Sequence, residues 1–158
     1  MHHRPSEATT VPVVSWVLVV DDEPDVRSLL REMLQEEGYG VLEATNGVEA
    51  LAVLRDSTRP LVTVLDHIMP ELSGSDVLTV VSLDPPLAAR HAFILATAEQ
   101  ATVPQTVVAF AHQHGVPLVA KPFDFDRLLI LVAGLAARLR LDARRTARQA
   151  AGARLTYP

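Results

Sequence analysis

The chain has 158 residues, of which 49% are hydrophobic and 21% are charged, a composition typical of a globular protein with room for one core. It contains no cysteine, which excludes disulfides, thiolate metal sites and cysteine nucleophiles. No apolar run approaches the roughly 18 residues of a membrane span. Residues 1–14 lack the apolar core of a signal peptide, so we expect a disordered leader on a soluble, cytoplasmic protein.

The formal net charge of −5 is unevenly distributed along the chain. Residues 1–137 hold eight basic and eighteen acidic residues, whereas residues 138–158 hold six arginines and one acid. An acidic body argues against a nucleic-acid surface on the main domain. We expect residues 142–158 to form an Arg/Ala-rich tail, a solvated helical extension that frays and is too short for a helix-turn-helix domain, so no direct DNA binding is predicted. Weak contact of this tail with an acidic partner stays open.

Apolar strand-like runs alternate with helix-like segments along the chain. The predicted strands are residues 16–20, 39–44, 61–65, 92–96 and 117–120. The predicted helices are residues 24–38, 45–57, 75–83, about 104–114, and a last one from about Asp124 to about Leu141. Five strands alternating with five helices predict an α/β fold with a parallel sheet and helices on both faces. In such a sheet, the functional crevice lies beyond the carboxyl ends of the strands.

Polar residues of the kind that bind a metal and a phosphate follow four of these strands. Asp21 and Asp22 follow the first strand, Asp66 the third, Thr97 the fourth and Lys121 the fifth. In isolation, the acids after the first strand could equally cap a helix, and Thr97 could be an ordinary strand-end threonine. Lys121 is the only lysine among 14 basic residues, which makes a surface role improbable.

Three close carboxylates repel each other unless a cation lies among them. Because all of the candidate ligands are oxygens, the set favours a hard ion such as Mg²⁺, or Mn²⁺ in its place. An ammonium and a hydroxyl suit phosphate oxygens. A carboxylate in this setting can act as a nucleophile, so Asp66 is interpreted as a phosphoryl acceptor.

The motifs VLVVDDEPDVR, VLDHIMPELSG, ILATA and VAKPF, in this order, resemble the receiver domains of two-component response regulators. The spacing is also similar, with 44 residues from Asp22 to Asp66, 31 more to Thr97 and 24 more to Lys121. The resemblance covers about residues 15–137, and we assign residues 15–141 to the domain. It implies a flavodoxin-like, doubly wound sheet with strand order 2-1-3-4-5.

The resemblance also implies roles for individual residues. Asp21, Asp22 and Asp66 would bind Mg²⁺ together with the backbone carbonyl of Ile68. Asp66 would accept a phosphoryl group from a sensor histidine kinase or a histidine phosphotransfer protein, and Lys121 and Thr97 would contact that group. The Lys121–Pro122 peptide bond would be cis.

Two features depart from the family pattern. Leu118 occupies the position of the usual aromatic switch residue, so the aromatic readout of phosphorylation is in doubt. Pro104 lacks an amide donor and fits only the first turn of a helix, so we expect the fourth helix to start late, behind a long, mobile loop. The leading hypothesis is a stand-alone receiver that signals by phosphorylation-dependent protein–protein interaction and is not an enzyme.

Two alternatives stay open. One is a receiver-like binding module that does not use phosphate, for which Leu118 leaves room. The other is an aspartyl-phosphate phosphohydrolase, although such enzymes usually carry an acid where this chain has Ile68.

Several other residues have simpler interpretations. His67 is expected to be a partly exposed bystander whose side chain points away from Asp66, and His112 and His114 are expected to be surface residues near a helix end. The last helix is apolar over more than one face, because Leu129 and Ile130 remain beside a core stripe of Leu128, Leu131, Val132 and Leu135. Burial against the fourth helix is the preferred explanation, and a homodimer or partner surface is the alternative.

Overall fold

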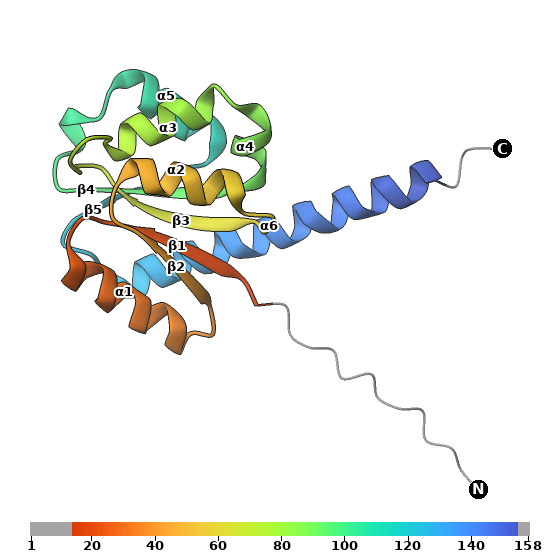
Figure 1. The fold of residues 1–158 in the computed structure, drawn as a ribbon, viewed down its shortest axis with the longest axis horizontal. Helices are drawn as coiled ribbons and strands as arrows, with labels where there is room; N and C mark the ends of the chain where they lie inside the picture. Colours follow the sequence, from red (N-terminus) through yellow and green to blue (C-terminus); the bar gives the residue numbers. More distant parts are fainter. Residues whose placement is uncertain (1–13, 155–158) are drawn as a thin grey trace, which may run out of the picture.

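A parallel five-stranded sheet forms the centre of the protein in the computed structural model, which describes residues 14–154 (Figure 1). The strands are β1 (Trp16–Val20), β2 (Gly40–Ala44), β3 (Leu61–Asp66), β4 (Ala92–Thr97) and β5 (Leu118–Ala120). Their order in the sheet is β2-β1-β3-β4-β5, and each neighbouring pair is parallel. This confirms the predicted fold class and strand order. Residues 1–13 and 155–158, which include most of the predicted leader and the end of the tail, lie outside the described residues.

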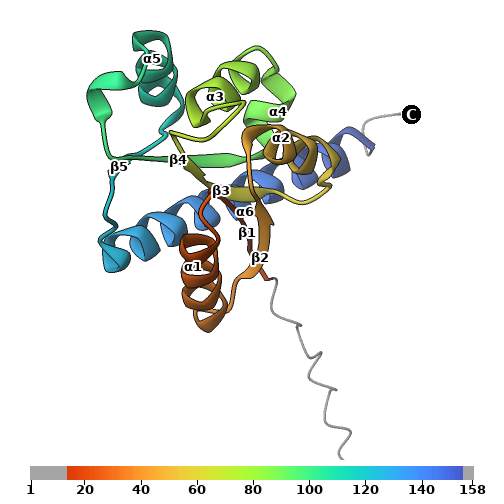
Figure 2. The same cartoon turned by 60° about the vertical axis from the view of Figure 1, so that its left-hand side comes forward.

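Helices cover both faces of the sheet (Figures 1 and 2). They are α1 (Pro24–Glu36), α2 (Gly47–Asp56), α3 (Gly74–Ser82), α4 (Pro85–Arg90), α5 (Gln105–His114) and α6 (Phe125–Arg154), with a short 3₁₀ helix, η1 (Gln100–Thr102). Residues from α1 and α6 form one apolar cluster with the sheet, whereas residues from α2, α3, α4 and α5 form the other. Strand residues alternate between the clusters, as the pleat requires: Leu18 and Leu65 face the second and Val19 and Val64 the first.

Local sequence explains where several of these helices begin. Asn46 caps α2 because its side chain accepts a hydrogen bond from the amide of Glu49. Ser73 and Asp76 form a reciprocal capping box at the start of α3. This second cap fixes the turn that follows β3.

The structure contains one α-helix more than the sequence predicted in residues 14–154. Helix α4 begins at Pro85, and its N-cap, Asp84, accepts a hydrogen bond from the amide of Leu87. The Pro-Pro pair discourages a helix prediction, yet proline fits the first turn, where no amide partner is needed. Buried Leu87 then anchors this short helix to the core.

The predicted late start of the helix after β4 is confirmed, because α5 begins at Gln105, directly after Pro104. The segment between β4 and α5 is partly ordered by η1, and Val103 within it is 4% exposed. The helix ends at Gly115, whose φ of +63° is the left-handed conformation that glycine adopts readily. His112 and His114 lie in its last turn and are exposed.

Helix α6 packs differently from the prediction, but its extension is confirmed. It continues past Leu141 to Arg154 as the solvated helical extension expected for the tail, and its residues from 140 onward are exposed and extend away from the sheet (Figure 1). The core stripe is Leu128, Val132, Leu135, Ala136 and Leu139, whereas Ile130 is 72% exposed. The preferred explanation of its apolar excess was wrong: α6 packs with α1 on one face of the sheet, and α5 lies on the other.

A buried histidine joins three elements at the opposite end of the sheet from the strand-end acids. His91 is 2% exposed and lies between α4 and β4. Its Nδ1 accepts a hydrogen bond from the amide of Leu61 at 3.1 Å, and its Nε2 donates to the carbonyl of Leu54 at 2.8 Å. Burial is the main reason that the pKa of His91 is lowered. The ring therefore fastens the starts of β3 and β4 to the end of α2.

None of the helices formed by residues 14–154 combines the length and the hydropathy that crossing a lipid bilayer requires.

Candidate functional site

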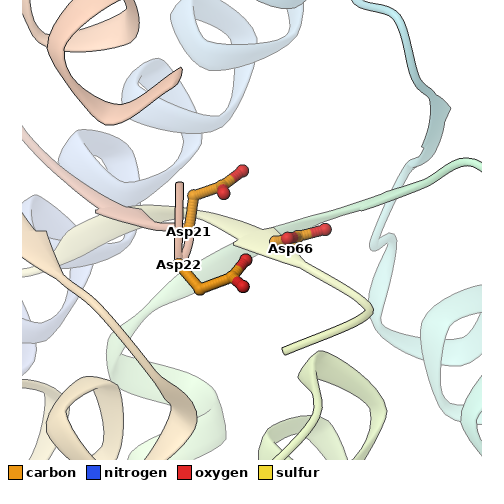
Figure 3. A group of neighbouring side chains, drawn as sticks. All are labelled: Asp21, Asp22 and Asp66. Atoms are coloured by element: carbon orange, nitrogen blue, oxygen red, sulfur yellow. The ribbon is translucent and has the colours of Figure 1, made fainter. Parts of the chain in front are cut away.

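Three carboxylates meet at the carboxyl ends of β1 and β3 (Figure 3). Asp21 and Asp22 directly follow β1, and Asp66 is the last residue of β3. One oxygen from each lies within 4.8 Å of the others. Asp21 is 2% exposed and Asp66 is 7% exposed, whereas Asp22 faces solvent. The structure therefore brings together the acids that the sequence placed at two separate strand ends.

Lys121 directly follows the edge strand β5 and joins the two buried carboxylates. Its Nζ lies 2.9 Å from Oδ2 of Asp21 and 3.1 Å from Oδ1 of Asp66. Burial alone would lower the pKa of Lys121, but the hydrogen bonds and charges of these two acids outweigh burial and raise it. The ammonium is therefore held in its charged form. The Lys121–Pro122 peptide bond is cis.

Burial and the neighbouring negative charge make Asp66 hard to ionise. Burial raises its pKa most, the charge of Asp21 raises it further, and Lys121 lowers it only in part, so that the pKa of Asp66 is about 6. One ammonium offsets only one of three negative charges. The cluster therefore has the excess of carboxylate oxygens that a divalent cation binds.

Asp21 is held in place from its backbone and its side chain. Its Oδ1 accepts a hydrogen bond from the amide of Glu23 at 2.9 Å. Its backbone carbonyl accepts one from Nη1 of Arg27 at 2.7 Å, and its amide donates to the carbonyl of Ala44 on β2. These contacts direct the carboxylate of Asp21 toward Lys121 and Asp66.

Thr97 lies at the end of β4, beside the strand that carries Asp66. It is 1% exposed, and its backbone carbonyl accepts a hydrogen bond from the amide of Lys121 at 3.1 Å. Its Oγ1 accepts one from the amide of Glu99 at 3.0 Å. In the parallel register, Ala96 pairs with Asp66, so Thr97 is one residue beyond that carboxylate on the adjacent strand.

The turn after β3 passes close to Asp66 because residue 74 is a glycine. The amide of Gly74 donates to the carbonyl of His67 at 2.8 Å. A Cβ atom at this position would lie 2.3 Å from the carbonyl oxygen of Asp66, closer than real side chains come. Between these points, Ile68 has a 57% exposed side chain, and the role of its carbonyl as a metal ligand stays a prediction.

The structure also gives the burial and contacts of Leu118 and His67, two residues that the sequence analysis singled out. Leu118 is partly buried and packs against the apolar cluster of α2–α5. His67 was expected to be partly exposed, and this was wrong, because the residue is 6% exposed. Its imidazole lies between Ser75 and Thr102, two polar partners that come from distant segments and that the linear sequence does not reveal.

Comparison with known proteins identifies the family to which this chain belongs. The family model of the response regulator receiver domain matches residues 17–133. The chain therefore belongs to this family, whose members act in two-component signalling. Receiver domains signal, in general, rather than catalyse, and they bind Mg²⁺ at an acidic pocket. The acidic cluster of Figure 3 is at the position where such a pocket is expected.

Individual relatives agree with this assignment. The chain is 32% identical to the chemotaxis protein CheY of Thermotoga maritima over 115 residues, which cover 72% of this chain and 90% of that protein. It is 35% identical over 130 residues to the probable transcriptional regulatory protein TcrX of Mycobacterium tuberculosis, covering 82% of this chain and 50% of that protein. The chain thus spans about half the length of this longer relative.

Solved structures show the same fold. The response regulator TrrA of Thermotoga maritima, crystallised in complex with Mg²⁺ and BeF, is 35% identical, with a TM-score of 0.65 over 77% of this chain and 99% of that chain. A CheY-like receiver domain from Methanospirillum hungatei is 25% identical, with a TM-score of 0.69 over 80% of this chain and 97% of that chain.

Proposed function

We propose that this protein is a phosphorylation-controlled receiver in which Asp66 accepts a phosphoryl group from a phosphohistidine on a sensor histidine kinase or phosphotransfer protein. The observation that carries this proposal is the bridge formed by Lys121, whose Nζ contacts the carboxylates of both Asp21 and Asp66. A plain helix cap or turn acid would not require a partly buried ammonium that contacts the acids of two strand ends. We assign this function to residues 15–141.

The proposed phosphoryl transfer is a displacement at phosphorus. A carboxylate oxygen of Asp66 forms the new O–P bond, and the N–P bond of the phosphohistidine breaks. The electron pair of that bond returns to the imidazole nitrogen of the donor, which takes up a proton. Lys121 would offset negative charge on the transferred group, and Thr97, one residue beyond the β4 partner of Asp66, would donate a hydrogen bond to it.

Asp21, Asp22 and Asp66, with the backbone carbonyl of Ile68, would hold Mg²⁺ or Mn²⁺. The three carboxylates fit a hard cation, because their ligand atoms lie within 4.8 Å of one another and carry more negative charge than Lys121 offsets. Such an ion, when bound, neutralises charge on the phosphoryl oxygens.

The output is proposed to be a phosphorylation-dependent interaction with another protein. Phosphorylation shifts an equilibrium between conformers, and a partner that prefers one of them provides the signal. Residues 142–154 of α6, which belong to the Arg/Ala-rich tail, are exposed. They are proposed to form a solvated extension that does not bind DNA directly. A homodimer formed through α6 stays an alternative, which light scattering with and without a phosphoryl mimic would test.

The direct test is incubation with Mg²⁺ and acetyl phosphate, followed by intact mass measurement. We expect one phosphoryl group per chain, stable in acid and labile in base, and none in Asp66→Asn or in the presence of EDTA. Asp56→Asn, which changes an exposed acid at the end of α2, is the matched control and should be modified like the parent chain. A phosphoryl group that persists in Asp66→Asn would contradict the assignment of the acceptor.

A phosphate-independent binding module is the second candidate, because Leu118 packs in the apolar cluster where the family usually has an aromatic switch. Failure of acetyl phosphate and of cognate kinases to modify the chain would favour it. A phosphohydrolase is disfavoured, since Ile68 offers no acid–base group. Multiple turnover of a small phosphate ester would be the result that supports a phosphohydrolase.

A further inference from the structure

A hollow of about 470 Å³ lies at the amino ends of the strands, on the opposite edge of the sheet from the acidic cluster. It is lined by the start of β1, by the turn before β3 and by α6 near the point at which this helix leaves the sheet (Figure 1). Its apolar wall includes Trp16, Val62, Ala136 and Leu139. The volume is within the range of roughly 300–1,000 Å³ that is typical of pockets for small molecules.

The ring of Trp16 is fixed in the wall of this hollow by two neighbours. A Cβ atom on residue 40 would lie 2.5 Å from the ring, so the ring rests directly on Gly40 of the neighbouring strand β2. The guanidinium of Arg59 lies over the same ring, with its Cζ 4.5 Å from the ring centroid. The aromatic wall and one cation of the hollow are therefore held in place before a ligand binds.

Arg140 of α6 supplies a second cation to the hollow. Its Nη1 donates a hydrogen bond to Oγ of Ser15 at 2.7 Å, which joins α6 to the residue before β1. Among the described residues that line the hollow, none is acidic. Within residues 14–154, neither Arg59 nor Arg140 forms an ion pair with a carboxylate. Each guanidinium has more N–H donors than these contacts use, so both can bind an anion.

We propose that this hollow, which we call the arginine pocket, binds an organic anion with one carboxylate and an apolar body, such as a medium-chain fatty acid or an aryl-substituted acid. The carboxylate would accept hydrogen bonds from Arg59 and Arg140. The apolar body would displace water from the wall that Trp16 and Leu139 help to form. The inference goes beyond the proposed function and does not depend on it, because no residue of the acidic cluster lines the arginine pocket.

Trp16 is the only tryptophan of the chain, so its fluorescence reports on the arginine pocket. The test is titration of the full chain with decanoate, below its micelle-forming concentration, and with 4-phenylbutyrate. We expect a saturable change in fluorescence, with one ligand bound per chain by equilibrium dialysis, for at least one of the two acids. Their relative affinities show whether an aliphatic or an aromatic body is preferred.

Two matched ligands separate the contributions of charge and apolar surface. Acetate keeps the carboxylate but lacks the apolar body, so it should bind at least about tenfold more weakly than decanoate. Decan-1-ol keeps the apolar body but lacks the charge that the arginines bind, so its affinity should also be about tenfold lower or less.

Two pairs of variants localise the ligand. Arg140→Gln should weaken the binding of decanoate about three- to tenfold, the effect of one charge-assisted hydrogen bond that is partly screened by solvent. Arg144→Gln changes an exposed arginine one turn further along α6, outside the pocket lining, and should bind like the parent chain. Ala143→Phe places a ring in the arginine pocket and should abolish binding, whereas Ala147→Phe, at an exposed position outside the lining, should not. Circular dichroism checks that each variant is folded.

Several outcomes would overturn the arginine pocket as an anion site. Equal affinities for decanoate and decan-1-ol, or equal affinities of Arg140→Gln and the parent chain, would show that the charge of the ligand is not recognised. Binding that persists in Ala143→Phe would place the ligand elsewhere, and the absence of saturable binding by both acids would refute the proposal directly. Light scattering on the same samples tests a different occupant. A dimer of the parent chain that dissociates in Ala143→Phe but not in Ala147→Phe would assign the arginine pocket to a second copy of the chain instead of an organic anion.

Discussion

Replacing Asp66 by asparagine should stabilise the metal-free fold at neutral pH. The pKa of Asp66 is raised from 3.8 to about 6, first by burial and then by the charge of Asp21. The folded state therefore binds the proton more tightly than the unfolded state. Stability from this group is fully present below about pH 3.8 and is lost as the pH rises through about 6.

The size of this stabilisation follows from the shift in the pKa of Asp66. Each pKa unit corresponds to about 1.36 kcal/mol, so an ionised Asp66 costs the fold about 3 kcal/mol at neutral pH. Asparagine keeps the shape of the side chain but carries no charge. The difference in unfolding free energy between Asp66→Asn and the parent chain should therefore grow by most of this amount between pH 4 and pH 7.

Urea denaturation in EDTA across this pH range measures the difference. The other acids titrate in both proteins, so subtracting the two curves isolates Asp66. Asp56→Asn removes an exposed acid and should run parallel to the parent chain at every pH. Parallel curves for Asp66→Asn would show that burial and Asp21 do not penalise the charge of Asp66. Added Mg²⁺ should stabilise the parent chain more than Asp66→Asn, because a ligand that binds only the folded state adds to its stability.

Three further substitutions test features of the scaffold by denaturant unfolding. Gly74→Ala should destabilise the fold by about 2 kcal/mol or more, because its Cβ would collide with the carbonyl of Asp66; a value near zero would show that the turn can relax. His91→Phe should cost about 2–4 kcal/mol, because it leaves a buried amide and a buried carbonyl without their partners; an unchanged midpoint would contradict this. Thr63→Val should stabilise by about 1 kcal/mol, because Oγ1 of Thr63 is fully buried and has no hydrogen-bond partner; a loss of stability would refute that explanation.

The sheet and the acidic cluster could be predicted because both depend on features that are local in the sequence. Each central strand is a short apolar run, and β3 and β4 are buried along their whole length. Since parallel strands end at the same edge, the residues that follow them must meet there. The contacts of Lys121 with Asp21 and Asp66 also depend on the strand order, which the resemblance to receiver domains implied.

The polar contacts of the two buried histidines could not be predicted in the same way. His67 bonds to Ser75 and Thr102, and His91 bonds to the backbone of α2 and β3. Such pairings depend on how loops and helices pack in three dimensions, and histidine suits both exposed and buried positions. The linear sequence shows a histidine beside Asp66 but not which segments enclose it.

The continuation of α6 beyond Leu141 could be predicted from composition but not from periodicity. Residues beyond Leu141 bury little apolar surface, so periodicity gives no signal that the helix continues. Alanine and arginine are nevertheless strong helix formers, and this propensity alone is consistent with a helix extending to Arg154. Helix α4 escaped detection because its Pro-Pro start resembles a turn.

The charge of the site indicates that phosphorylation should depend on a divalent cation more strongly than folding does. With every group ionised, the three carboxylates and Lys121 carry a net charge of −2. An aspartyl phosphate dianion would change this to about −3 in the same partly buried space. The repulsion that already raises the pKa of Asp66 would therefore oppose the product still more. We expect the rate of modification by acetyl phosphate to fall by at least tenfold in EDTA, while the parent chain stays folded by circular dichroism. Modification at an undiminished rate in EDTA would show that Lys121 alone offsets this charge, and the case for a metal at Asp21 and Asp22 would fail.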